Sequence, residues 1–138
     1  MTRNSSSPAD FTSTVSLVDS YTHVWSEPDS TLRRKAVSEL WASTGVEFVE
    51  GAQFRGREQL TTRVAEAYDA FVGSGKYLVA AADDLSVHGD VVMFTIQLLP
   101  SQPHDDGKPA WTARVFLIVD EHGRILEDYH LTVQPLEA

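Results

Sequence analysis

The chain has 138 residues, enough for one domain and too few for two, and it contains no cysteine, which excludes disulfides, thiolate metal sites and a cysteine nucleophile. Its formal charge of −9 argues against nucleic acid as a partner, which needs a basic surface, and against docking on anionic lipid. No segment approaches the roughly 20 apolar residues of a membrane span, and residues 1–10 lack the apolar core of a signal peptide, so we expect a cytoplasmic protein without membrane contact.

The first half of the chain has the apolar spacing of helices. Residues 1–10 include three consecutive serines and a proline and have little to bury, so we expect a disordered tail before a single domain over 11–138. The spacing predicts three helices, with a short strand between the second and the third. These elements are expected at 11–26, from Asp29 to Gly45, at 46–49 and at 56–72.

The second half has the pattern of strands. Runs of β-branched and aromatic residues alternate with turn residues, which predicts an antiparallel meander. The strands are expected at 77–82, 85–87, 91–99, 111–119 and 125–133. Three helices followed by such a meander predict an α+β fold, in which the helices lie on one face of a curved antiparallel sheet.

Four short segments, in this order, resemble the nuclear transport factor 2-like superfamily and in particular its SnoaL-like polyketide cyclase branch. They are residues 21–25, 39–42, 54–58 and 120–125, and the resemblance extends over about residues 13–133. It implies a cone-shaped, cystatin-like fold, in which the curved sheet wraps around a pocket that the helices close. The superfamily includes ketosteroid isomerase, limonene epoxide hydrolase, scytalone dehydratase and polyketide cyclases, so the fold by itself leaves the reaction open.

Strand alternation assigns the side chains of the sheet to two faces. The last strand places Asp128 and His130 on one face, which the resemblance identifies as the pocket side. The other residues expected to line the pocket from the sheet are Met93, Thr95, Gln97, Trp111, Val115 and Leu126. The opposite face is more apolar than a solvent face should be, because it is expected to carry Val92, Phe94, Ile96, Phe116 and Ile118. We therefore expect a homodimer that forms through this outer sheet face.

Asp128 and His130 are the strongest candidates for catalytic residues. Residues two positions apart on one strand face are separated by about 6.5–7 Å, so their side chains can meet directly or through one water. A carboxylate that holds an imidazole supplies a general base with a fixed tautomer. The alternative is that Asp128 caps a backbone group at the sheet rim and that His130 is a hydrogen-bonded wall of the pocket.

Tyr21 and Trp25 lie one helical turn apart and point the same way, so with Trp111 they are expected to form an aromatic pocket wall. Tyr21 matches the tyrosine on the first helix of ketosteroid isomerase. The two acids of that enzyme fall at about Val49 and Val115 here, so its complete catalytic set is absent. What the resemblance still implies is a single-aspartate acid/base reaction of the SnoaL type.

Two functions are therefore open. The first is a cofactor-free cyclase, isomerase or lyase that acts on a small hydrophobic or polyketide-like molecule. Asp128 is then the acid/base, His130 is its partner, and Tyr21 with Gln97 orients a carbonyl group. The second is a non-catalytic ligand-binding or protein-interaction domain on the same scaffold. No metal site is expected, because the five histidines are scattered and no HxH or HxxxH spacing occurs.

Overall fold

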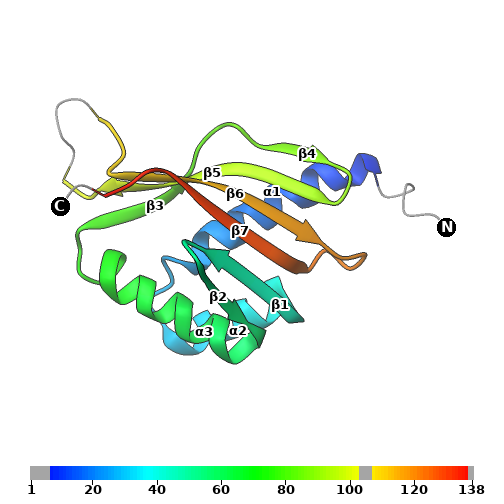
Figure 1. The fold of residues 1–138 in the computed structure, drawn as a ribbon, viewed down its shortest axis with the longest axis horizontal. Helices are drawn as coiled ribbons and strands as arrows, with labels where there is room; N and C mark the ends of the chain where they lie inside the picture. The colour runs from blue at the N-terminus through cyan, green and yellow to red at the C-terminus, as the bar shows by residue number, and fades with distance from the viewer. Residues whose placement is uncertain (1–6, 103–106, 137–138) are drawn as a thin grey trace.

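A computed structural model of the chain describes residues 7–102 and 107–136. Its helical elements are α1 (Ser7–Val24), α2 (Ser30–Leu40), α3 (Gly56–Ala67) and a short π-helical turn, η2 (Tyr68–Val72). Its strands are β1 (Trp41–Val49), β2 (Ala52–Arg55), β3 (Tyr77–Ala81), β4 (Ser86–His88), β5 (Val91–Pro100), β6 (Trp111–Val119) and β7 (Ile125–Gln134). The predicted order of three helices and a curved sheet is confirmed, and the fold is α+β (Figure 1).

The helices follow the predicted pattern with shifted ends. α1 begins at Ser7, ahead of the predicted start at Phe11, and residues 1–6 of the expected tail lie outside the described part of the chain. Asp29 caps α2, since its side chain accepts hydrogen bonds from the backbone N–H groups of Thr31 and Leu32 at 2.8 and 3.1 Å. Among the described residues, none of the helices combines the length and the apolar character that a membrane span requires.

The second helix is shorter than predicted because the first strand replaces its last turn. α2 ends at Leu40 and β1 begins at Trp41, where the sequence predicts helix as far as Gly45. Trp41 pairs with Ile125 of β7, and a Cβ atom on Gly45 would lie only 2.9 Å from the carbonyl oxygen of Ile125. Glycine is therefore required here for a close approach of two strands, and it does not mark a helix end.

The seven strands form one sheet in the order β2-β1-β7-β6-β5-β3, and β4 pairs with β5. The sheet is mixed, which corrects the predicted antiparallel arrangement, because β1 runs parallel to its neighbour β7. β2, which the sequence does not predict as a strand, forms an antiparallel hairpin with β1. As a result, the first hairpin of the chain lies next to its last strand, and side chains that are far apart in the sequence become neighbours.

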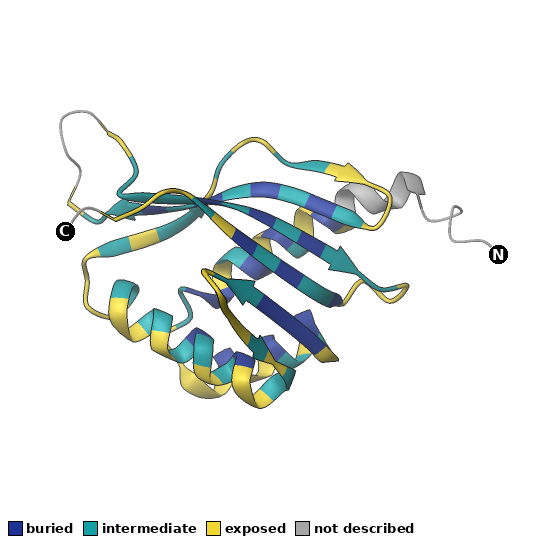
Figure 2. Cartoon of the chain, in the orientation of Figure 1, coloured by how far each residue is buried: buried dark blue, intermediate teal, exposed yellow. Residues whose placement is uncertain are grey.

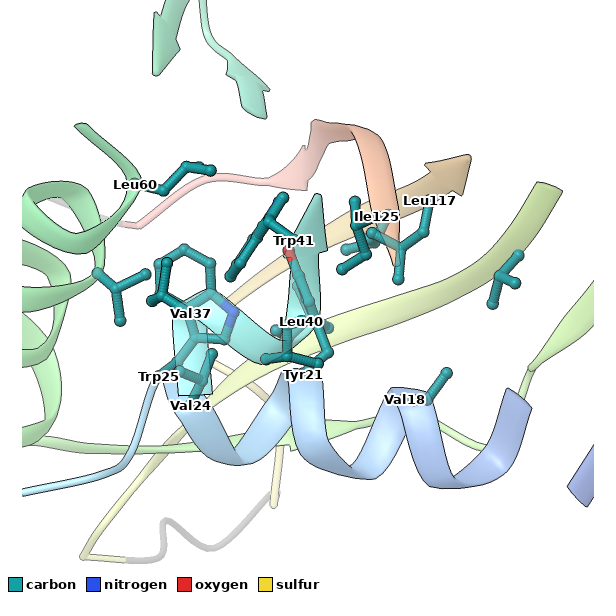
Figure 3. Packing of buried hydrophobic residues seen from close by; sticks show 14 of the residues in the cluster. Val18, Tyr21, Val24, Trp25, Val37, Leu40, Trp41, Leu60, Leu117 and Ile125 are labelled. Carbon is teal, nitrogen blue, oxygen red and sulfur yellow. The ribbon is translucent and has the colours of Figure 1, made fainter. Parts of the chain in front are cut away.

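The hydrophobic core lies between the helices and the inner face of this sheet. Buried and partly exposed positions alternate along β5 and β6, as Figure 2 shows. The buried side chains of α1, among them Val18, Tyr21 and Val24, belong to one apolar cluster with Trp41 and Leu117 (Figure 3). α1 therefore presents its apolar stripe to the sheet, and Tyr21 brings a hydroxyl group into an otherwise apolar layer.

The alternation corrects the predicted faces of β5. Phe94 and Ile96 are buried on the inner face, whereas Met93 lies on the outer face. The register of β5 against β6 is not visible in the sequence, and a shift of one residue exchanges the two faces of a strand. A homodimer through the outer face therefore cannot use Val92, Phe94 or Ile96, since all three are buried on the inner face. It remains a prediction, with Phe116 and Ile118 as its apolar contacts, because both lie on the outer face as expected.

Candidate active site

A cavity of about 220 Å³ lies between the C-terminal end of α1, α3 with η2, and the inner face of the sheet. Apolar side chains form most of its wall. The lining residues are Trp25, Val49, Glu50, Arg63, Ala67, Phe71, Val72, Val79, Ile96, Gln97, Leu98, Trp111, His130, Thr132 and Leu136. A cavity of about 150 Å³ holds benzene, and drug-sized ligands fill roughly 300–1,000 Å³, so this volume fits one ring with a short side chain.

A larger hollow of about 1270 Å³ lies between α1 and the turns that connect β4 to β5 and β6 to β7. Its wall contains none of the predicted site residues and none of the buried charged side chains of the described chain. Chemistry on a ligand needs positioned polar groups that are shielded from water, and these lie beside the smaller cavity. We therefore place the candidate site there.

Three ionisable side chains from two strands meet beside the smaller cavity. The parallel pairing of β1 with β7 sets Glu47 opposite Asp128 and Val49 opposite His130. Glu47 and Asp128 are fully buried, and only 4% of His130 is exposed. Because alternate residues of a strand share a face, all three side chains project from the inner face of the sheet.

Tyr21 of α1 completes this polar cluster. Its hydroxyl donates a hydrogen bond to Asp128 Oδ2 at 2.7 Å and also contacts His130 Nε2. His130 Nε2 lies 3.3 Å from Asp128 Oδ1 and 3.3 Å from Glu47 Oε2. Three oxygen atoms therefore surround Nε2, which favours a proton on this nitrogen and leaves Nδ1 as the nitrogen that gains and loses a proton.

Arg63 of α3 connects this cluster to the cavity. Its Nε donates a hydrogen bond to Glu47 Oε1 at 2.8 Å, and its Nη2 lies 3.5 Å from Glu47 Oε2. The guanidinium Cζ also lies 5.2 Å from the centre of the Trp25 ring, a cation–π contact. The Arg63 side chain is 22% exposed, and it lines the cavity together with Trp25 and His130. One side of the cavity is therefore polar, while the remainder is largely apolar.

Two buried nitrogen atoms in this polar side have no hydrogen-bond partner among the described residues. They are Trp25 Nε1 and His130 Nδ1, and both side chains line the cavity. A buried polar atom without a partner costs about 1–3 kcal/mol, so a ligand that supplies one gains binding free energy. Trp41 Nε1 is also unpartnered, but Trp41 belongs to the core and does not line the cavity.

The surroundings shift the pKa values of the cluster. Burial raises the pKa of Glu47, and Asp128 adds to this effect, while His130 and Arg63 oppose it without cancelling it. Burial alone lowers the pKa of His130, but the carboxylates of Asp128 and Glu47 outweigh it, so the pKa of His130 lies above its ordinary 6.5. Burial and the charge of Asp128 raise the pKa of Tyr21 well above 10.0, so its hydroxyl stays a donor.

Glu47, Asp128 and His130 also have the geometry of a metal-binding set. Their ligand atoms all lie within 4.8 Å of one another, and one imidazole with two carboxylates is a donor set that divalent metals accept. Arg63 and a protonated His130 supply two positive charges beside the two carboxylates, so the charges of the cluster balance without an ion. The sequence-based expectation of no metal remains a prediction.

The structure brings together part of the predicted site. Trp25 and Trp111 line the cavity, and His130 does so in contact with Asp128. Gln97 also borders the cavity, but it alternates with the buried Ile96 and Leu98, so its side chain belongs to the outer face of β5. Asp128 itself is fully buried behind His130 and does not line the cavity. Tyr21 does not line the cavity either, because it is fully buried and is connected to the cavity only through its contact with His130.

Four residues that were predicted to line the pocket lie elsewhere. Thr95 is on the outer face, where its hydroxyl donates a hydrogen bond to Asp84 Oδ2 at 2.6 Å, and Met93 shares that face. Val115 is on the inner face but is sealed inside the core. Leu126 lies at the register shift between β6 and β7, which takes it out of the series of inward-facing residues.

Glu47 and Arg63 were missed by sequence reasoning. In the first strand, Glu47 sits between apolar neighbours, a pattern that normally indicates a solvent face. A signal was present in α3, where Arg63 falls within the apolar stripe that contains Leu60 and Val64. A charged side chain on the buried face of a helix needs a buried partner of opposite charge, and that requirement points to an inward-facing acid.

No protein-family model and no curated protein sequence matches this chain. Solved structures do. A candidate isomerase of the SnoaL-like family from Agrobacterium tumefaciens superposes with a TM-score of 0.75 at 21% identity, over 88% of this chain and 97% of that one. A candidate polyketide cyclase from Sinorhizobium meliloti gives 0.63 at 22% identity, over 83% of this chain and 93% of that one.

A third similar structure is a protein with a ketosteroid isomerase-like fold from Catenulispora acidiphila, in complex with trimethylamine. Its TM-score is 0.62 at 20% identity, over 83% of this chain and 82% of that one. At these identities the likeness is one of fold, and it agrees with the fold that the sequence resemblance implies. The chain therefore has the nuclear transport factor 2-like fold.

Proposed function

We propose that the chain is a cofactor-independent acid/base enzyme that moves a proton on a carbon atom next to a carbonyl group of a small hydrophobic molecule. One observation carries the proposal. His130 is a buried imidazole on the wall of a largely apolar cavity, with three oxygen atoms around Nε2 and, within the described part of the chain, no hydrogen-bond partner at Nδ1. This is the arrangement of a general base whose tautomer is held by its neighbours.

The reaction proceeds at Nδ1 of His130. The lone pair of Nδ1 takes the proton from the carbon atom, the C–H electrons form the new carbon–carbon double bond, and the carbonyl electrons move onto oxygen. The resulting imidazolium is stabilised by the carboxylates of Asp128 and Glu47, which lie 3.3 Å from Nε2. Return of the proton from Nδ1 to a different carbon gives an isomerisation. Attack of the enolate carbon on a second carbonyl group of the same molecule gives a cyclisation, in which the proton returns from Nδ1 to the new alkoxide oxygen.

Asp128 changes its role relative to the sequence prediction. Because it does not line the cavity, it is a positioning residue that acts through His130 and not the acid/base itself. Tyr21 holds Asp128 with a hydrogen bond at 2.7 Å and contacts His130 Nε2, so both residues fix the plane of the imidazole. Gln97 borders the cavity, but its side chain belongs to the outer face with Met93 and Thr95, so we do not assign it the predicted role of orienting a substrate.

The similar structures support a reaction of this class, because two of them are a candidate isomerase and a candidate polyketide cyclase. The cavity volume limits the size of the substrate. About 220 Å³ accommodates one ring with a short side chain, and a polycyclic molecule would have to project from the opening. We therefore favour a monocyclic or branched ketone over a larger polyketide.

A second function, binding without catalysis, is favoured by one observation. Asp128 and Tyr21, the groups expected to act on a ligand, do not line the cavity, so only His130 of the predicted catalytic set can touch one. A protein that only binds would hold its ligand in the same cavity and leave its C–H bonds unchanged. The two functions therefore differ in a measurable property.

Exchange of carbon-bound protons with solvent tests the proposal with a model ketone in place of the natural substrate. Phenylacetone, a single-ring ketone with acidic C–H groups, is incubated with the protein in heavy water and followed by proton NMR. We expect exchange faster than with free imidazole at the same concentration, and a fall of at least about a hundredfold in His130→Gln. Binding of phenylacetone with exchange no faster than in the imidazole control would reject catalysis and leave the binding function.

A further inference from the structure

The polar side of the cavity contains a second feature, which the acid/base chemistry of His130 does not use. The Arg63 guanidinium lies over the Trp25 ring there, with its Cζ 5.2 Å from the ring centre. The rings of Trp25 and His130 have their centres 5.8 Å apart. All three side chains line the same cavity, so the base and two hydrogen-bond donors border one ligand-sized space.

Both donors have N–H groups that the protein does not use. Trp25 Nε1 is buried and has no hydrogen-bond partner among the described residues. Arg63 engages Glu47 through Nε and Nη2, which leaves Nη1 for another acceptor. An indole N–H can only donate, and so can a guanidinium group, so the partner that satisfies both must be an acceptor.

We infer that Trp25 and Arg63 form the binding site for an acceptor oxygen of the ligand, and that the cavity selects small molecules with one apolar body and one carbonyl or carboxylate oxygen. This inference rests on the proposed function for the cavity and deepens it by naming the ligand class. The apolar wall, which includes Phe71, Val79 and Leu98, receives the body of the molecule.

The arrangement also explains how the site can favour an enolate. Negative charge that develops on the oxygen lies next to the Arg63 guanidinium and the Trp25 N–H, while the proton moves to His130. Donors that are already in place when charge develops stabilise a transition state more than rotating solvent does. Since Glu47 neutralises Arg63 only from one side, the guanidinium keeps its other edge for the ligand.

Three probes of the same shape test the inference by binding alone. Phenylacetone has a carbonyl oxygen, phenylacetate has a carboxylate, and isobutylbenzene has neither. We expect phenylacetone, phenylacetate or both to bind at least about tenfold more tightly than isobutylbenzene, as measured by NMR titration. The comparison between phenylacetone and phenylacetate then shows whether the site takes a neutral or an anionic oxygen.

Two matched variants test whether the preference for an oxygen-bearing probe depends on the N–H group of Trp25. Trp25→Phe keeps an aromatic ring and removes the N–H, and it should reduce the preference for an oxygen to less than about threefold. Trp111→Phe makes the same change in a tryptophan that also lines the cavity but has no buried unpartnered N–H, and it should leave the preference intact. An equal loss in both variants would overturn the inference, and so would equal binding of all three probes to the wild-type protein.

A measurement on the wild-type protein covers the case in which Trp25→Phe fails to fold. The indole N–H resonance of Trp25 should move on addition of the oxygen-bearing probe and stay in place with isobutylbenzene. The resonances of Trp41 and Trp111 are internal references. A Trp25 resonance that responds equally to both probes would overturn the inference. Proton exchange without a preference for an oxygen-bearing probe would reject the inference and keep the proposed function. A preference for an oxygen-bearing probe without proton exchange would keep the inference and reject the proposed function.

Discussion

The pair Glu47–Arg63 gives the sharpest stability prediction. Replacing Arg63 with methionine keeps the apolar stem and removes the only arginine or lysine that pairs with Glu47 in the described chain. Removal of one partner from a buried ion pair costs about 3–5 kcal/mol. The Arg63 side chain is 22% exposed, so water replaces part of the lost interaction. We therefore expect Arg63→Met to lower the free energy of unfolding by about 2–3 kcal/mol at pH 8, or roughly 5–15 °C in Tm.

The loss should depend on pH in a defined direction. The folded-state pKa of Glu47 is raised above its ordinary 4.5, so the folded protein binds this proton more tightly than the unfolded chain. That contribution to stability is complete below pH 4.5 and is lost as the pH rises through the raised value. Arg63 lowers the pKa of Glu47, so its removal raises the pKa further, and the deficit should shrink when the pH is lowered and Glu47 is protonated in both proteins.

Urea denaturation followed by tryptophan fluorescence at pH 5 and pH 8 measures the effect. Arg34→Met is the matched control, because Arg34 pairs with Glu58 and both side chains are mostly exposed, at 58% and 86%. It should cost no more than about 1 kcal/mol. The double variant Glu47→Gln with Arg63→Met should recover at least half of the loss, since the Glu47 carboxylate is then no longer buried without its cationic partner. A deficit equal to that of Arg34→Met, or one that grows on acidification, would show that Arg63 does not stabilise a buried Glu47 carboxylate.

Three further predictions concern the site and the faces of the sheet. Because the pKa of His130 is raised, its contribution to stability is complete below pH 6.5 and is lost as the pH rises through the raised value. Chemical denaturation should show this decline of stability with pH in the wild-type protein and a flatter pH dependence in His130→Gln, and an identical pH dependence in both would contradict the prediction. Ile96→Lys should yield insoluble or unfolded protein because Ile96 is only 3% exposed, whereas Met93→Lys should fold, and a folded Ile96→Lys would show that the faces are reversed. If the outer face is the dimer interface, sedimentation should give about 30 kDa for the wild-type dimer of 15.3 kDa chains and about half of that mass for Met93→Lys. Chelation with EDTA should leave Tm unchanged because His130 supplies the charge between Glu47 and Asp128, and a fall of several degrees that zinc restores would identify a metal in the cluster.

The parts of the fold that depend on short-range spacing were predictable. Helices could be located from apolar periodicity, and the contact between Asp128 and His130 follows from alternation within one strand. Tyr21 and Trp25 were expected to point the same way from one turn of helix, and their rings do lie 5.9 Å apart. In each case the relevant geometry is contained in a few consecutive residues.

The parts that depend on strand pairing were not predictable. The parallel pairing of β1 with β7, which sets Glu47 opposite Asp128, joins segments about eighty residues apart and leaves no local trace. The face of β5 depends on its register with β6, so Ile96 was placed outside although it lines the cavity. The roles of Asp128 and His130 could not be assigned from the sequence for the same reason, because only the packed structure shows that His130 reaches the cavity and Asp128 does not.

The titration of His130 shows whether two buried carboxylates hold this imidazole as a base. With labelled histidine, NMR gives the midpoint of His130, assigned by its disappearance in His130→Gln, in the wild-type protein and in Asp128→Asn. We predict a wild-type midpoint above 6.5, because Asp128 and Glu47 outweigh the effect of burial. We also predict a fall of about one pH unit or more in Asp128→Asn, since an adjacent opposite charge is removed. A midpoint that is below 6.5 in the wild-type protein, or that does not move in Asp128→Asn, would contradict the account of His130 as a base held by two buried carboxylates.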